Sequence, residues 1–98
     1  MERVIVWNKR PSKFLAKVLR RISEDSQLQA ERVEEVILNA IQGIIRNPER
    51  YPPDKFNKKN LGNCRAFEIM SLRVAYKLTA IQIRILRIRH VRQEPLDY

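Results

Sequence analysis

The last third of the chain, from residue 64 onward, most constrains the fold, because apolar residues and cations alternate there in three runs. The runs read CRAFEIM, LRVAYKLT and IQIRILRIRHV. Alternation with a period of two is typical of β-strands that bury one face. The clearest case is the second run, where Leu72, Val74, Tyr76 and Leu78 alternate with Arg73, Ala75 and Lys77. A sheet built from these runs would display positive side chains on its other face, and such a row suits a phosphate backbone.

The third run changes phase, since Ile81, Ile83 and Ile85 are followed by Leu86 and Ile88. A β-bulge near Ile85-Leu86 would restore the alternation and would put Arg84, Arg87 and Arg89 on one face. The alternative is a strand buried on both sides at its centre, which would scatter those arginines. We favour the bulge.

The first half of the chain predicts one strand and two helices. Residues 2–8 form a short apolar run that predicts a buried strand. Apolar residues then recur at helical spacing over 10–23, after a proline that suits a first turn. Ser26 and Gln29 fit a capping box for a second helix, which Asn47-Pro48 should stop.

The element order is therefore β-α-α-β-β-β, an α+β fold. We expect an antiparallel helical hairpin packed on one face of a mostly antiparallel four-stranded sheet, with the basic face opposite. The 98 residues fit a single domain, 1–98.

Charge indicates an anionic partner, because the net charge is +9 and the isoelectric point is near 10.3. The segment 24–45 is net acidic, so one element should face away from that partner. One cysteine and one histidine allow neither an internal disulfide nor an ordinary zinc site, and we expect no metal or other cofactor. With no signal peptide and no apolar stretch of about 20 residues, we expect a cytoplasmic protein without membrane contact.

The polar connection over 46–63 contains three prolines, and we expect little regular structure in it. Lys55, Lys58 and Lys59 lie close to Phe56 in the sequence, an interleaving that suits RNA contact. A solvated loop would have the same composition, and the sequence favours neither interpretation.

The chain as a whole resembles the RelE/ParE superfamily, the toxins of bacterial type II toxin–antitoxin pairs. The resemblance is carried by the VIVW strand, the helical hairpin, NPERYPPDKF, CRAFEI and RVAYKLT…IRILRIRHVRQEP. It implies a cognate antitoxin as partner. It also implies one of two targets, since RelE-like members cut messenger RNA on the ribosome and ParE-like members poison DNA gyrase.

The messenger RNA target is the first expectation. The resemblance then implies that Arg65 holds the scissile phosphate and that His90 acts as a proton carrier, with Arg87 stabilising charge. These three residues are the predicted catalytic set. The predicted RNA-binding set is Lys55, Lys58, Lys59, Arg73, Lys77, Arg84 and Arg89.

Several alternatives stay open at this point. Arg65 could form a salt bridge with Glu68 or Glu94, and His90 could be a merely hydrogen-bonded histidine at a strand end. A second proton carrier would have to be Tyr98, Glu68 or a lysine of 55–59. The alternative target is DNA gyrase, which requires no catalytic group, and a third hypothesis is a non-toxic nucleic-acid-binding module.

Overall fold

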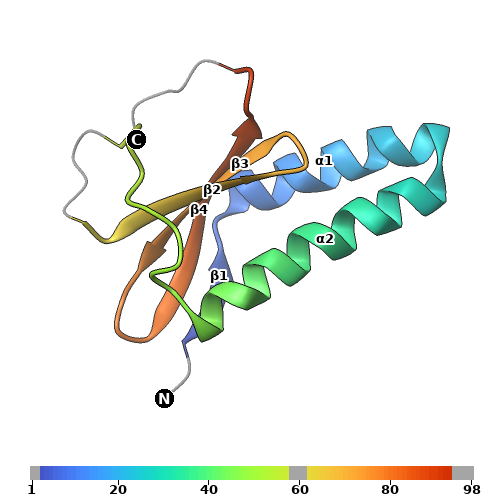
Figure 1. The fold of residues 1–98 in the computed structure, drawn as a ribbon. Coiled ribbons are helices and arrows are strands. Elements are labelled where there is room, and N and C mark those ends of the chain that lie inside the picture. The colour runs from blue at the N-terminus through green and yellow to red at the C-terminus, as the bar shows by residue number, and fades with distance from the viewer. Residues whose placement is uncertain (1–2, 58–61, 94–98) are drawn as a thin grey trace.

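The computed structural model describes residues 3–57 and 62–93, and the described elements follow the predicted order (Figure 1). They are β1 (Val4–Trp7), α1 (Lys9–Asp25), α2 (Gln27–Arg46), β2 (Cys64–Ile69), β3 (Leu72–Leu78) and β4 (Gln82–His90). The α+β class is confirmed. In the part of the chain that the structure describes, neither helix combines the length and apolar character that a membrane span needs.

The four strands form one sheet in the order β1-β4-β3-β2. The β2–β3 and β3–β4 pairs are antiparallel, whereas β1 and β4 are parallel. The sheet is therefore mixed, and mostly antiparallel as predicted. The parallel pair needs a long crossover connection, and the two helices belong to that crossover.

The predicted bulge in β4 is confirmed. Tyr76 lies opposite Ile85, and the preceding residue of β3, Ala75, lies opposite Arg87, so Leu86 is the extra residue. The extra residue lets apolar side chains before and after it face the same side of the sheet.

Both helices cover one side of the sheet and run antiparallel beside each other (Figure 1). Ser26 separates them in an extended conformation, and its hydroxyl accepts a hydrogen bond from the Gln29 N–H at 3.1 Å. This cap satisfies a donor that would otherwise be left free at the start of α2. Ile37, Ile41 and Ile44 of α2 are buried against the sheet side that carries Tyr76.

Tyr76 is the largest fully buried side chain of this core. Its hydroxyl donates to the Pro48 carbonyl at 3.0 Å, which ties the end of α2 to the middle of the sheet. Burial raises the pKa of Tyr76 to about 12 from its usual value of 10.0. The neutral phenol is therefore the form that the folded protein holds.

We expect Tyr76→Phe to lower the free energy of unfolding by about 1 kcal/mol at neutral pH, because one buried hydrogen bond is lost. The pH dependence tests the same contact. The pKa of Tyr76 is higher in the folded protein, so its contribution is complete below pH 10 and is lost toward pH 12. Urea unfolding should show a smaller difference between the two proteins at pH 11.5 than at pH 8; a difference independent of pH would contradict this account.

Candidate functional site

The sheet face opposite the helices is basic, as predicted. Residues that pair directly across antiparallel strands share a face. Arg73 pairs with Arg89, Lys77 with Arg84, and Ala75 with Arg87, all on the side away from Tyr76. We call these five cations, Arg73, Lys77, Arg84, Arg87 and Arg89, the basic sheet face.

The connection after α2 is more ordered along the sheet than its prolines suggest. The Ala66 N–H donates to the Pro52 carbonyl at 3.3 Å, and the Asp54 N–H donates to the Cys64 carbonyl at 2.9 Å. Pro53 forms an isolated bridge with Arg65. Residues 52–54 therefore cover the edge of β2 through one isolated bridge, while the described part of the connection contains no helix or strand, as predicted.

This arrangement brings a carboxylate to the basic sheet face. The Asp54 side chain is 1% exposed, and its Oδ1 lies 3.0 Å from Arg73 Nη2. Arg73 also contacts Glu68 at 3.0 Å, although the Glu68 side chain is 54% exposed. Two carboxylates thus compensate the charge of Arg73.

Phe56 follows the same turn and lies over the guanidinium groups. Its N–H donates to Asp54 Oδ1 at 3.0 Å. The Cζ atom of Arg73 lies 4.7 Å from the centre of the Phe56 ring, and that of Arg89 lies at 5.1 Å. Lys55 Nζ also lies 5.1 Å from that centre. The ring is therefore occupied by cations of this chain and stabilises them.

Arg89 is buried as well, with 7% of its surface exposed. Its guanidinium donates to the His90 and Gln93 carbonyls at 3.1 and 2.8 Å. Burial, followed by the charges of Arg73 and Arg87, lowers the pKa of Arg89. Arg73 and Arg89 thus hold the fold together at one end of the basic sheet face.

Arg65 lies on the other side of the sheet, because it pairs with Tyr76. Its Nη1 donates to the Tyr51 carbonyl at 2.6 Å and to the Glu49 carbonyl at 3.3 Å. Its Nε is buried and has no hydrogen-bond partner among the described residues. Arg65 therefore secures the chain that leaves α2. Of the alternative salt bridges, Glu68 is taken by Arg73 instead.

His90 also lies on the helix side, because it pairs with the buried Leu72. Its ring meets the ring of Phe14 edge-on at 5.5 Å between centroids. It also lines an apolar groove between the helices and the β2–β3 turn. The groove has a volume of about 400 Å³ and is lined mainly by Phe14, Val18, Ile22, Met70 and Leu72, with Lys17 and Arg21 beside them.

The structure does not bring the predicted catalytic set together. Arg87 lies on the basic sheet face, whereas Arg65 and His90 lie on the helix side. Arg65 and His90 are also far apart from each other. Arg65 pairs with Tyr76 and His90 pairs with Leu72, so the two residues lie four positions apart along the strands, about 13 Å. They also lie two strands apart across the sheet, because β3 separates β2 from β4, which adds about 10 Å in that direction.

The described members of the predicted RNA-binding set, in contrast, lie together: Arg73, Lys77, Arg84 and Arg89 share the basic sheet face, and Lys55 lies over the same Phe56 ring as Arg73 and Arg89. Arg84 donates to the Asn8 side chain at 2.9 Å, and Lys77 is exposed. Lys58 and Lys59 lie outside the described residues, as do Glu94 and Tyr98. Across 3–57 and 62–93, no three of the His, Cys, Asp and Glu residues lie close enough together to hold a metal ion.

Asp54 is the site residue that sequence reasoning missed. A signal for it exists, because aspartate after two prolines often starts a turn by accepting the N–H two residues later. The Asp54–Phe56 hydrogen bond is such a turn. The partner Arg73 has no local signal, since 19 residues separate it from Asp54.

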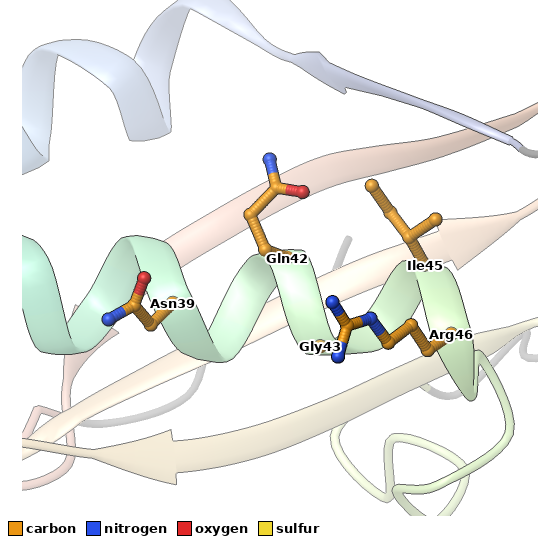
Figure 2. A pocket seen from close by; sticks show the side chains of 5 residues that line it. All are labelled: Asn39, Gln42, Gly43, Ile45 and Arg46. Atoms are coloured by element: carbon orange, nitrogen blue, oxygen red, sulfur yellow. The ribbon is translucent and has the colours of Figure 1, made fainter.

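A second, open pocket of about 320 Å³ lies along the last turns of α2 (Figure 2). It is lined by Asn39, Gln42, Gly43, Ile45 and Arg46. Gln42 and Ile45 project from a different side of the helix than Asn39 and Arg46. Two amides and a guanidinium can bind polar groups, but none of these side chains is an effective proton carrier near neutral pH.

We expect Asp54→Asn to destabilise the protein by about 3 kcal/mol, because it leaves the partly buried Arg73 without its buried charged partner and with only the exposed Glu68. The control is Glu68→Gln, which removes the exposed partner of the same arginine and should cost less than about 1 kcal/mol. Urea unfolding at pH 7 measures both. Equal effects of the two substitutions would contradict the importance assigned to Asp54.

The comparison with known families agrees with the fold. Residues 5–95 match the family described as ParE toxin of type II toxin-antitoxin system, parDE. No curated protein matches the sequence. The match spans nearly the whole chain and includes every described strand except the first residue of β1. The chain therefore belongs to the RelE/ParE toxin superfamily of type II toxin–antitoxin systems.

Proposed function

We propose that this toxin arrests growth by inhibiting DNA gyrase, without cleaving RNA. The observation that carries the proposal is the separation of Arg65 and His90 from Arg87 by the sheet itself. General acid–base chemistry requires the participating groups within hydrogen-bond reach of one reacting centre. Three side chains on two faces of a sheet do not meet that requirement.

The contacts of these side chains support the same proposal. Arg65 is engaged by two backbone carbonyls, and Arg73 is compensated by two carboxylates. A phosphate at these positions would have to displace contacts that hold the fold. The description of the matched family, a ParE toxin, also favours the gyrase branch.

Ribosome-dependent cleavage of messenger RNA, the first expectation from the sequence, is the competing function. Lys77, Arg84 and Arg87 share the basic sheet face, and Lys77 is exposed. They could contact RNA, but the proton carrier would have to come from elsewhere than His90.

Two assays on the same purified protein separate these functions. We expect loss of gyrase supercoiling of relaxed plasmid, and intact reporter message in a translating extract analysed by primer extension. His90→Ala should inhibit gyrase as the parent protein does, because His90 has no catalytic role in this proposal. Breaks that appear only with translating ribosomes, together with unimpaired supercoiling, would overturn it.

The cognate antitoxin is the partner that membership of this superfamily implies. We propose that it docks an acidic amphipathic segment in the apolar groove beside α1. The groove offers apolar lining with Lys17 and Arg21 at its side, and Met70 is 43% exposed there. Apolar anchors with flanking carboxylates would match both features.

Met70→Asp tests the groove. Met70 has a positive φ of 52°, a conformation that aspartate tolerates well, so the substitution should leave the turn intact. Its carboxylate would repel an acidic segment, and we expect antitoxin affinity to fall by at least about tenfold in isothermal titration. Ile81→Asp is the matched control, since Ile81 is 69% exposed and does not line the groove. Equal affinities for the two variants would exclude the groove as the docking site.

A further inference from the structure

The outer surface of α1 carries a basic stripe that the proposed function does not use. The stripe consists of Lys9, Arg10, Lys13, Lys17, Arg20 and Arg21, all exposed. At about 100° per residue, these positions fall within an arc of about 120° on the helix, and the apolar positions of α1 fall outside that arc. Glu24 and Asp25 end the stripe at the last turn of the helix.

The charge of this stripe is not compensated within the part of the chain that the structure describes. None of its six side chains forms an ion pair or a side-chain hydrogen bond with another described residue. The basic sheet face differs, because Arg73 is paired with two carboxylates and Arg89 is buried. Within the described residues, α1 therefore carries a continuous row of exposed cations that form no ion pairs.

The position of the cations also opposes the stability of the helix. Lys9, Arg10 and Lys13 lie at the N-terminal end, where the helix macrodipole is positive, and the first turn has no acidic residue. Each cation there costs about 0.3–1 kcal/mol at low salt. Since helix stability does not account for this arrangement, binding of an anion is the better explanation.

We propose that the outer face of α1 binds the phosphate backbone of duplex DNA without sequence preference. From Lys9 to Arg21 the stripe is about 18 Å long, and a duplex presents about ten phosphate charges over that length. The helix also fits the major groove of B-DNA, which is about 12 Å wide, whereas the major groove of A-form RNA is too narrow.

The residue types of the stripe favour DNA over the other anionic partners. Protein interfaces are built around aromatic and apolar anchors, which this arc lacks. Single-stranded nucleic acids are bound by stacking on aromatic rings, and the stripe contains none. The apolar groove is a separate surface, of which only Lys17 and Arg21 are shared with the stripe.

The test uses the double variant Lys9→Gln/Lys13→Gln, which leaves the groove residues unchanged. Removing cations from the N-terminal end of α1 should not destabilise the helix, so a change in binding reports the stripe itself. The matched control is Arg32→Gln/Arg46→Gln, which removes two exposed cations from α2. Both variants have the same net charge.

Fluorescence anisotropy of a labelled 24-base-pair duplex, measured between 50 and 300 mM NaCl, reports affinity and its salt dependence. We expect the Lys9/Lys13 variant to bind at least about tenfold more weakly at 0.1 M salt, with a log–log salt slope reduced by about 2. The α2 control should bind as the parent protein does. Antitoxin affinity is measured on the same two variants, and we expect it to be unchanged in both; gyrase inhibition is a separate assay of the proposed function.

Four outcomes would overturn the proposal. One is absence of binding to the duplex at 50 mM NaCl, and another is an equal loss of affinity in the two variants. The third is a loss of antitoxin affinity in the Lys9/Lys13 variant with unchanged DNA affinity, which would assign the stripe to the antitoxin. Tighter binding to a single strand of the same length would likewise exclude the duplex as the preferred ligand.

Discussion

The position of β4 between β1 and β3 is the constraint on which the rest of the structure depends. It pairs in parallel with β1 through its first four residues and antiparallel with β3 along nearly its whole length. The bulge at Leu86 lets Ile83, Ile85 and Ile88 all reach the core. Without the extra residue, Ile83 and Ile85 would face one side of the sheet and Ile88 the other. Whichever side faced the helices, an arginine of β4 would then enter the core.

The same register divides the cations of the chain among three environments. On the basic sheet face, Arg73 is held by Asp54, Glu68 and the Phe56 ring, and Arg89 lies over the same ring. Arg65, on the helix side, is held by backbone carbonyls. Among the residues that the structure describes, α1 is the element that presents a long series of exposed cations. A net charge of +9 therefore says little by itself about where an anion binds, because charges that stabilise the fold and charges open to a partner contribute equally to the sum.

The sequence predicted local features well. The order of elements follows from periodicity, the start of α2 from Ser26 and Gln29, and the bulge from the phase change after Ile85. These signals are local, since each depends on residues within about one or two turns or on one strand. The meeting of Asp54 with Arg73 is not local, and neither alternation nor composition predicts it. The phosphate-binding role expected for Arg65 required its side chain to share a face with Arg87. The face that Arg65 occupies is set by its pairing with Tyr76 of β3, which the sequence does not specify.

The sequence by itself determined the elements, the core-facing residues of β3 and β4, and the excess of positive charge. Only the tertiary structure decided which cations are compensated, because compensation requires a carboxylate, a carbonyl or a ring to come within a few ångströms from a distant part of the chain. It also decided that Arg65 and His90 lie on the helix side and Arg87 on the opposite one. A one-residue change of pairing reverses the face of a strand residue, so residue spacing alone does not assemble a site.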